Sequence, residues 1–574
     1  AGIDTRAFQA RLDALDPTAN PFAAFGAGAL GALMTDRARS ISNTGNVQAT
    51  MGGPLFKMPA GDVSTNFKAG FEYIGFDGRS TRGLNTQSSS LSRRNANGQV
   101  NIDIPITSRR SGVLAGFGNF SLNANLAVRQ LSDFGTLSTL GGGFVWTPIA
   151  PVNLVGSYTR DEGAPTVNQL GDPTIVTPQV RAFDYATGRT VDVTQISGGN
   201  RALLADNRRV WKLGLTLKPF QDKNDLTIIA NYVRTQTRNS AASLPSPTAD
   251  LEQAFPDRFV RDADGDLIQI DTRPVNFARE RRDELRYGLN FSINLKSIMQ
   301  KKFETWIAAR REGKNLPPPV PFNSFRPTLA GNKADQQRRQ QEQQQRRQQD
   351  RGDQPSAQQP TNAAPVGGAA PPASGSPPSG EAVGGRPPGG FGGGGFGGGG
   401  GGFRGGGGGG RGGQASGRLQ IAIYDTWTFR DDVLIRQGVP LLDLLNGGSI
   451  GGTGQSEHQV QLQLGYANNG LGARLEGNWK SATDVRGGTG TIGDLHFSPL
   501  ATANFRLFAD LGAMPSLIGK QWARGMRVSL RFNNVFNSRQ RVRDANGDTP
   551  LRYQPAYLDP LGRTISISIR KLIF

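Results

Sequence analysis

The chain has 574 residues, with 65 Lys and Arg against 46 Asp and Glu, which gives a formal net charge of +19 at pH 7. It has no Cys and two His, so disulfide scaffolds, thiol chemistry and Cys-based metal centres are excluded, and few residues are left for His-based catalysis. No run approaches the roughly 18 apolar residues of a transmembrane helix, but barrel strands remain compatible because their alternating hydropathy averages out.

The first residues of the sequence do not have the pattern of a secretion signal. The sequence begins at Ala1 without a Met, a basic stretch or the apolar core of a secretion signal. We interpret this as a removed signal or a partial chain. The excess of positive charge favours anionic partners such as lipid head groups, nucleic acid or anionic solutes.

Apolar and polar residues alternate strictly in many segments between residues 45 and 298. Two clear runs are Phe120–Arg129 and Glu284–Lys296. Successive side chains of a strand point to opposite faces, so each run predicts a β-strand with one apolar and one polar face. We therefore expect residues 45–298 to form a first block of strands.

A low-complexity segment follows, from residue 299 to residue 416. It contains a Pro-rich stretch, a Gln/Arg tract (DQQRRQQEQQQRRQQDRGDQ) and a long Gly tract (FGGGGFGGGGGGFRGGGGGGRGG). Few side chains in it can be buried, so nothing offsets the entropy lost on ordering the chain. We predict a disordered insertion rich in Gly, Pro and Gln.

The alternation returns in a second block, residues 417–574, which ends in the last strand of the chain. Clear runs are His458–Tyr466, Leu471–Lys480 and Met526–Asn533. The polar residues of both blocks that we expect to face the interior of a barrel are Arg286, Asn290, Asn294, Gln459, Gln461, Gln463, Arg474, Glu476, Asn478, Arg527 and Arg531.

Two architectures explain such strands. A soluble sandwich exposes its polar faces to water, but its strands usually have about 5–6 residues. The runs here have about 9–13 residues, which is closer to the roughly 9–11 of a tilted membrane-spanning strand. Their polar faces combine Arg, Lys, Asn and Gln, as in the wet interior of a wide barrel. We therefore predict an all-β fold, an antiparallel transmembrane β-barrel with about 15 strands in this chain, nine before the insertion and six after it.

The connections support the barrel. Short ones alternate with long ones, which span residues 161–208, 239–281, 432–457 and 537–562. Short turns on one side, long loops on the other and aromatic girdles are typical of outer-membrane barrels. The Trp residues near expected strand ends are Trp146, Trp211, Trp427, Trp479 and Trp522.

Two segments carry a more specific pattern, NLVGSYTRDEGAPTVNQLG (Asn153–Gly171) and GGNRALLADNRRVWKLGLTLKPF (Gly198–Phe220). Together with Val528–Asp544 they resemble the TonB-dependent outer-membrane receptors. In that family a G-A-P-T/S element leads into an outer loop, and a G-N-x-x-L-x-x-(E/D) element precedes the next strand. The matching positions are Gly163, Ala164, Pro165, Thr166, Gly199, Asn200, Leu203 and Asp206.

The resemblance implies a barrel of roughly 22 strands with a plugged lumen, so we expect about seven strands and the plug to lie outside this sequence. The family's last strand descends to the periplasm and ends in a terminal Phe used for membrane insertion, here Phe574. Counting strands back from it, we expect residues 1–44 to be a partly helical outer loop and the insertion to lie on the periplasmic side.

The implied function is TonB-energised uptake of a scarce solute, such as a ferric siderophore, across the cell outer membrane of a Gram-negative bacterium. The implied partners of this monomer are outer-membrane lipid, the solute, the barrel-assembly machinery and the TonB complex, which acts through the plug. No enzymatic activity, cofactor or metal is expected. Inward arginines favour anionic solutes, and the 161–208 and 239–281 loops are expected to set specificity.

Two alternatives remain at the level of sequence. A passive porin-like channel has the same strand pattern, and an RGG-type RNA-binding protein has the same charge and Gly/Arg tract, although no folded RNA module is visible. The segments DADGD (Asp262–Asp266) and DANGD (Asp544–Asp548) resemble calcium loops but lack the required Gly and Glu, so we interpret them as turns. His458 and His496 each lie near a carboxylate, and we interpret them as solvent-exposed or rim residues.

Overall fold

The computed structural model describes residues 2–3, 6–14, 16, 20, 33–34, 36–82, 85–220, 224–242, 244, 248–314, 417–450, 453–487, 493–517 and 519–572. The expected disorder of residues 315–416 and the expected role of Phe574 fall outside these ranges.

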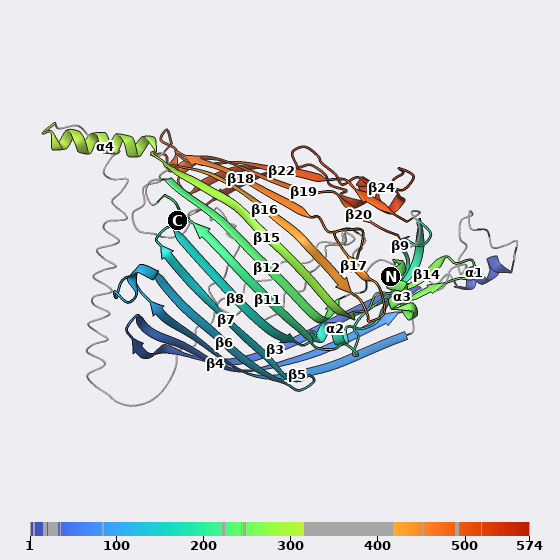
Figure 1. Ribbon diagram of the computed structural model, residues 1–574. Helices are drawn as coiled ribbons and strands as arrows, with labels where there is room; N and C mark the ends of the chain where they lie inside the picture. The colour runs from blue at the N-terminus through green and yellow to red at the C-terminus, as the bar shows by residue number, and fades with distance from the viewer. Residues whose placement is uncertain are drawn as a thin grey trace, which may run out of the picture.

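One large antiparallel sheet dominates the fold (Figure 1). It has sixteen strands, fifteen of which follow each other in one hydrogen-bonded path, while β17 (Leu441–Asp443) pairs with β16 only. The path runs through β3 (Asp36–Met58), β4 (Gly61–Arg82), β5 (Asn85–Thr107), β6 (Asn119–Leu131), β7 (Gly135–Ile149), β8 (Val152–Gly163), β11 (Asp206–Leu217), β12 (Asn224–Ala242), β15 (Val275–Leu295), β16 (Gly417–Leu434), β18 (His458–Asn468), β19 (Leu471–Lys480), β22 (Leu500–Asp510), β23 (Met526–Asn533) and β25 (Thr564–Lys571).

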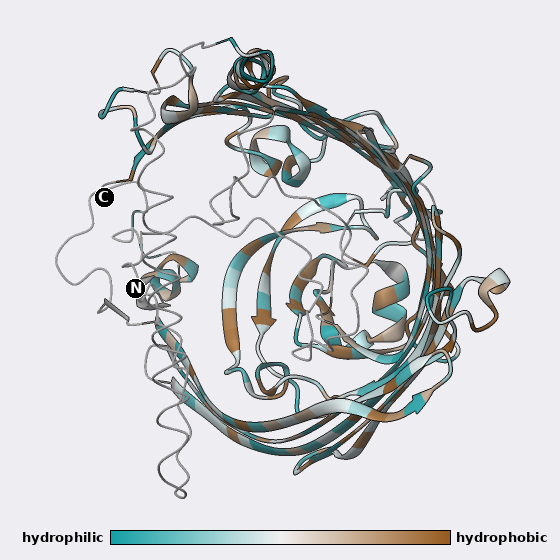
Figure 2. Ribbon diagram, turned by 90° about the vertical axis from the view of Figure 1, so that its left-hand side faces the viewer, coloured by the Kyte–Doolittle hydropathy of each residue, from teal (hydrophilic) through white to brown (hydrophobic). Residues whose placement is uncertain are grey.

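The sheet curves around most of a ring, as Figure 2 shows along the ring's axis. Its two edge strands are β3 and β25, and no pairing joins them within the described ranges. The ring is thus open on one side. The fold class is that of a large barrel-like antiparallel sheet, and the predicted count of nine strands before the insertion and six after it is confirmed.

The connections divide the molecule into two ends. At the short-turn end the chain crosses from β3 to β4, β7 to β8, β11 to β12 and β18 to β19 in a few residues. At the loop end it makes the long connections 163–206, 242–275, 434–458, 480–500 and 533–564, which we call the loop layer. The insertion leaves β15 and enters β16 at the short-turn end, where α4 projects away from the sheet (Figure 1).

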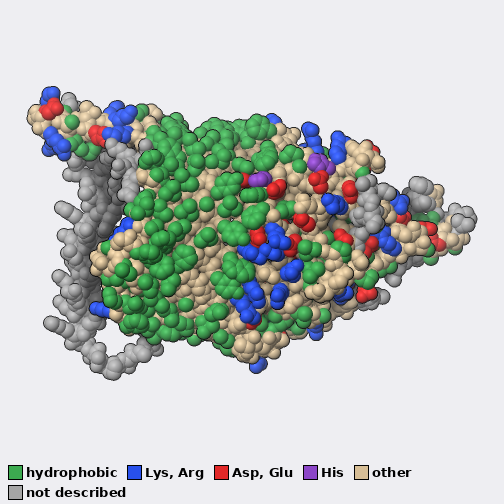
Figure 3. Space-filling view, in the orientation of Figure 1, with side chains coloured by type: hydrophobic (Ala, Val, Ile, Leu, Met, Phe, Trp, Pro, Cys, Tyr) green, Lys and Arg blue, Asp and Glu red, His purple; other side chains and the backbone are tan. Residues whose placement is uncertain are grey.

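The outer wall of the ring is apolar where it is nearest the short-turn end (Figure 3). Alternation produces this face, because every second side chain of a strand points outward. Leu213 is 52% exposed on β11 and Ile567 is 72% exposed on β25. Exposed apolar side chains on this scale are typical of a surface that contacts lipid or a partner.

Two predicted boundaries need correction. Strand β3 begins at Asp36, inside the range 1–44 that we expected to be a loop. Its first residues are polar and carry no apolar alternation, yet they pair with β4 from Asp36 opposite Arg82 onward, because barrel strands continue beyond the apolar band. Helix α4 (Ile298–Arg311) occupies the start of the segment expected to be disordered; the Ser297 side chain accepts a hydrogen bond from the Gln300 backbone N–H and so caps it.

The loop layer contains two small sheets. The first has four strands, β9 (Ile175–Asp184), β10 (Arg189–Ser197), β13 (Phe259–Arg261) and β14 (Leu267–Asp271). The second has three, β20 (Thr483–Val485), β21 (Leu495–Phe497) and β24 (Val542–Asp544). The remaining strands and helices are β1 (Gly2–Ile3), β2 (Leu33–Met34), α1 (Arg6–Asp13), α2 (Val167–Gly171), α3 (Ala249–Ala254) and α6 (Pro555–Leu558). None of the described helices has the length and apolar character needed to cross a membrane.

Candidate functional site

The eleven polar residues singled out in the sequence lie on one face of the large sheet. Strand pairing places Gln461 opposite Asn478 and Gln463 opposite Glu476, and residues directly opposite each other share a face. The Arg286 guanidinium lies 5.0 Å from the Tyr424 ring centre and donates to Gln461 Oε1 at 3.0 Å. Asn290 and Asn294 follow on the same face of β15, two and four alternations closer to the short-turn end.

Three arginines stand side by side on this inner face. Arg474 of β19 pairs with Arg506 of β22, which pairs with Arg531 of β23. We call them the arginine row. Glu476 Oε1 lies 2.7 Å from Arg474 Nε, while Arg527 lies over the Phe508 ring at 4.5 Å. Like charges directly opposite each other on a sheet repel, so this row is a local concentration of positive charge.

Arg506 was not among the predicted residues. The signal is present in the sequence, because Asn504 and Arg506 alternate with Phe505 and Leu507. What the sequence lacks is the register that sets Arg506 between two other arginines.

At the loop end, the two family-like segments meet. Gly163 ends β8 and pairs with Asp206, the first residue of β11. The next residues turn into α2, where the Thr166 side chain accepts from the Gln169 N–H at 3.2 Å and the Gln169 side chain accepts from the Thr166 N–H at 2.9 Å. This reciprocal capping box explains a Thr at this position. Between them, Ala164 is half-buried and Pro165 is buried.

The second segment docks onto α2. The Gly199 N–H donates to Asp172 O at 2.8 Å, and the Asn200 N–H donates to Gln169 O at 2.7 Å. The Asn200 side chain donates to Pro274 O at 2.8 Å, and Leu203 is buried beside it. The motif residues therefore fasten the 163–206 connection to the rim of the sheet and to the 242–275 connection.

A Gly199→Ala substitution is expected to loosen this contact. An added Cβ would lie 2.6 Å from both Gly171 N and Leu170 C, so the backbone must move, at about 1–3 kcal/mol. Trypsin should then cut the 172–200 stretch faster in detergent-purified protein, as mass spectrometry of the fragments would show. Gly98→Ala is the control, because its Cβ meets nothing within 4 Å. Equal cleavage of the two variants would contradict the docking role.

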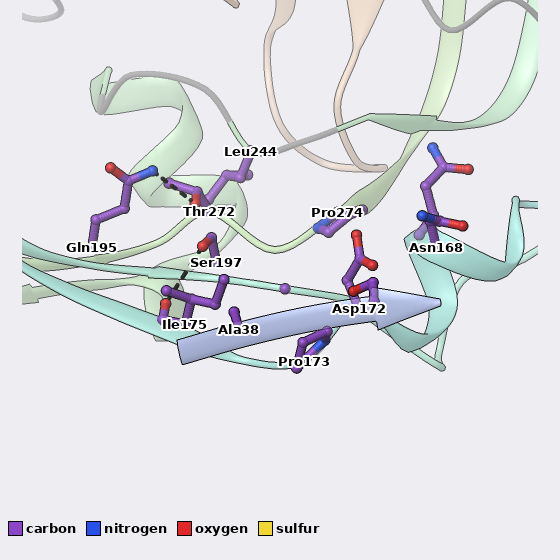
Figure 4. A pocket seen from close by; sticks show the side chains of 13 residues that line it. Ala38, Asn168, Asp172, Pro173, Ile175, Gln195, Ser197, Leu244, Thr272 and Pro274 are labelled. Atoms are coloured by element: carbon purple, nitrogen blue, oxygen red, sulfur yellow. Dashed lines mark hydrogen bonds between the residues drawn. The ribbon is translucent and has the colours of Figure 1, made fainter. Parts of the chain in front are cut away.

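A cavity of about 610 Å³ lies beside this contact (Figure 4). It is lined by β3, by α2 and the residues after it, by β9 and β10, and by the 242–275 connection. Polar and apolar residues both form its walls, and Asp172 is the one carboxylate among the lining residues. Burial raises the pKa of Asp172, which a hydrogen bond with Ser40 opposes. Gln195 donates to Thr272 Oγ1 at 3.2 Å across one side.

Two apolar clusters hold the loop layer together. The larger joins three connections, with Val193 of β10, Leu267 of β14 and Leu442 of β17 among its buried members. Asp184, which is fully buried, binds Arg261 through two hydrogen bonds of 2.8 and 2.9 Å. Burial alone would raise the pKa of Asp184, but these bonds hold it below its usual value.

The smaller cluster connects distant parts of the chain. Phe183 and Tyr185 from the 163–206 connection pack on Val485 and Phe497 and, from the 533–564 connection, on Tyr553. The Tyr185 and Tyr553 hydroxyl oxygens are 3.1 Å apart. The loop layer therefore lies within the outline of the ring when viewed along its axis (Figure 2) and spans its mouth.

A buried carboxylate lies at the loop end of β16, beyond Trp427, and is expected to make the stability of the chain depend on pH. Burial raises the pKa of Asp431 to about 6, with Arg282 opposing the shift and Glu280, Asp432 and Glu284 adding to it. The folded chain thus keeps a proton that the unfolded chain releases between about pH 4 and 6, so stability falls as pH rises through this window.

We expect Asp431→Asn to stabilise the chain at pH 7.5 by about 1–2 kcal/mol, after allowing for solvent screening. At pH 4 the variant and the wild type should unfold alike. Guanidinium unfolding in detergent at both pH values measures this, with Asp264→Asn, an exposed carboxylate, as control. A pH-independent difference would contradict the assignment.

The other candidate motifs form local structure. Asp262 Oδ1 accepts from the Asp264 and Asp266 N–H groups, and Asp544 Oδ1 accepts in the same way from Asn546 and Asp548, which confirms the predicted turns. The two His lie in separate places: His458 Nδ1 is 2.9 Å from Asp425 and His496 Nδ1 is 2.7 Å from Asp484. Within the described ranges no three His, Asp or Glu gather as a metal site would require.

Comparisons with known proteins give matches by structure. No protein-family model matches the chain, and no curated protein matches its sequence. Among solved structures, the chain is similar to the siderophore receptor PirA from Acinetobacter baumannii, with 9% identity and a TM-score of 0.43 over 93% of this chain and 55% of that chain.

Two further structures show the same degree of similarity. One is a mutant of the ferric enterobactin receptor PfeA from Pseudomonas aeruginosa and the other is the outer membrane transporter YddB from Escherichia coli. Each has 12% identity and a TM-score of 0.43, over 92% of this chain and 54% of that chain. The chain therefore spans about half the length of the proteins that it matches.

Proposed function

We propose that this chain is the larger part of the barrel of an outer-membrane receptor, which takes up a scarce anionic solute such as a ferric siderophore with energy from the TonB complex. The observation that carries the proposal is the outward series along neighbouring strands. On β11 it runs from Leu215 and Leu213 to Trp211 and then to Arg209. This is the order of acyl chains, interface and head groups in a membrane.

The inner face supports a path for an anion. The arginine row places three positive charges on adjacent strands, and arginine binds anionic oxygens through paired N–H donors. The loop layer at the mouth supplies contacts that could hold a ligand before it enters. No covalent chemistry is needed for such a role, so we propose a transporter without enzymatic activity.

The resemblance of the 163–171 and 199–206 segments to the receptor family supports the energised route over a passive channel. The loop layer also spans the mouth of the ring, which favours gated capture. We propose TonB, acting through a plug, the barrel-assembly machinery and outer-membrane lipid as the partners. The attachment of the insertion at the short-turn end supports a periplasmic position for it.

The test is a binding measurement on the detergent-purified chain. Quenching of Trp fluorescence by a ferric catecholate siderophore should be saturable. Arg474→Gln, Arg506→Gln and Arg531→Gln together should weaken it by roughly a hundredfold or more, since each charge-assisted hydrogen bond contributes about 1.5–3 kcal/mol.

The control removes the same charge from the short-turn end. It combines Arg109→Gln, Arg110→Gln and Arg311→Gln, and we call it the short-turn control variant. It should bind like the wild type. A chain that stays soluble without detergent, or one that binds the siderophore equally well without the arginine row, would contradict the proposed function.

A further inference from the structure

A second group of arginines lies on the outside of the ring. In Figure 3 Lys and Arg side chains gather on the outer wall beside the apolar band, on the side of the loop end. We call this group the outer-wall arginine patch. Its members are Arg160, Arg209, Arg234, Arg238, Arg279, Arg281 and Arg430.

Strand register fixes the direction of these side chains. Arg234 of β12 lies opposite Trp211, one alternation beyond Tyr232, which lies opposite Leu213. Since Leu213 is on the exposed apolar wall, Arg234 points outward as well. Arg234 pairs with Asp283 on β15, and Asp283 pairs with Arg430 on β16. Asp283 and Arg430 therefore point outward too.

The patch lies at a defined depth. On β8 the outward series is Leu154, Tyr158 and Arg160, and on β12 it is Ile228, Tyr232 and Arg234. Two residues of a strand span about 6.6 Å, so at a tilt of about 45° the arginines stand roughly 5 Å beyond the aromatic belt. That is where lipid head groups begin.

The charge of the patch is not neutralised by the protein. Four carboxylates share its face: Glu162, Asp283, Asp432 and, opposite Asp432 on β17, Asp443. The first three lie 3.0 Å from Arg160, 3.6 Å from Arg234 and 2.6 Å from Arg430, respectively.

Three arginines of the patch have no such partner. Within the described ranges no carboxylate lies at ion-pair distance from Arg209, Arg238 or Arg279. Seven arginines against four carboxylates leave an excess of three positive charges on a wall that faces lipid.

The residue type indicates the ligand. Every basic residue of the patch is Arg, whose planar guanidinium binds phosphate through two parallel N–H donors, whereas Lys acts as a point charge. An aqueous anion would be met by the inner face or the loops. A ligand that reaches the outer wall just beyond the aromatic belt must come from the membrane.

We propose that the outer-wall arginine patch binds the phosphate groups of an anionic lipid carrying more than one phosphate in the leaflet that surrounds the loop end. The proposal rests on the proposed function, because it requires the apolar wall to lie in a membrane. The patch then fixes the depth and tilt of the barrel and couples the outer strands to the leaflet around them.

The test uses the full chain in nanodiscs of phosphatidylcholine, with diphosphoryl lipid A, phosphatidylglycerol or no added lipid. The variant combines Arg209→Gln, Arg238→Gln and Arg279→Gln, which have no carboxylate to leave unpaired. Native mass spectrometry counts the retained lipid. We expect diphosphoryl lipid A binding to fall by roughly tenfold or more in this variant, because each arginine near an anionic surface adds to the attraction.

The short-turn control variant removes equal charge and should retain the lipid. Equal retention by wild type and patch variant, or equal loss in the control, overturns the proposal. Competition by inorganic pyrophosphate at the concentration of the lipid also overturns it, because the site would then be one for free phosphate. Failure of the proposed function is distinct, since the chain would then not enter nanodiscs.

Discussion

In a Phe183→Ala variant, the two sides of the loop layer are expected to separate. Phe183 is 1% exposed and packs edge-on against Tyr185 and Tyr553, with ring centres 4.9 and 5.7 Å away. Deleting a buried Phe side chain destabilises packing by about 3–5 kcal/mol. The 163–206 and 533–564 connections meet in this cluster, where the Tyr185 and Tyr553 hydroxyls also pair, and through a hydrogen bond from Arg552 to Arg181 O. The loss therefore falls on the contact between these two connections.

Spin labels measure the separation directly. The chain has no Cys, so Ala186→Cys and Ala545→Cys, both exposed, give a unique pair of labels. Double electron–electron resonance should show one narrow distance in the parent and a broad, longer distribution after Phe183→Ala. The large sheet should keep its resistance to heat in detergent, because its strand pairing is untouched.

The matched control lies two residues from Tyr553. Leu551 is 43% exposed, so Leu551→Ala removes an apolar side chain of the same connection without opening the cluster. It should leave the distance distribution narrow. A narrow distribution after Phe183→Ala would show that other contacts hold the two connections together, and the role given to the smaller apolar cluster would fail.

The alternation of apolar and polar residues along the chain predicted the large sheet well. Alternation in runs such as Glu284–Lys296 depends only on which side chains meet lipid and which meet water, and that requirement is local. The placement of Arg286, Gln461 and Asn478 on one face followed from the same rule. The family-like motifs also marked Gly163 and Asp206 as positions at the ends of strands, but the pairing of these two residues came only from the structure.

Register and loop packing could not be predicted. The sequence gives no sign that Arg506 stands between Arg474 and Arg531, since this depends on how far β22 slides along β19. The start of β3 was missed because its first residues are polar on both faces, and a strand beyond the lipid needs no apolar alternation. Helix α4 was missed because low complexity further along the chain dominated the interpretation.

The loop layer illustrates the difference between local and distant causes. Asp184 and Arg261 lie in different connections, yet they form a buried ion pair. Nothing within a window of sequence around either residue indicates the other. From the sequence alone we therefore interpreted the polar connections at the loop end as solvated loops. In the structure they pack around two apolar clusters.

A Leu267→Ala variant should loosen the other half of the loop layer. Leu267 is 1% exposed and lies in the larger apolar cluster, which joins the 163–206, 242–275 and 434–458 connections. Removing a buried Leu side chain is expected to destabilise this cluster by about 2–5 kcal/mol. The parallel pairing of β10 with β14 should weaken with it, because Leu267 is the first residue of β14.

Hydrogen exchange tests this expectation at the level of single segments. Peptides covering residues 175–197 and 259–271 should exchange faster in Leu267→Ala than in the wild type, while peptides from β11 and β12 should not change. The control is the next residue along β14: Ile268 is 44% exposed on the opposite face, so Ile268→Ala shares the strand and the chemistry of the change. Equal exchange rates in the two variants would show that burial of Leu267 does not hold the connections together. Faster exchange in the β11 peptides would show that the loops and the sheet unfold as one unit.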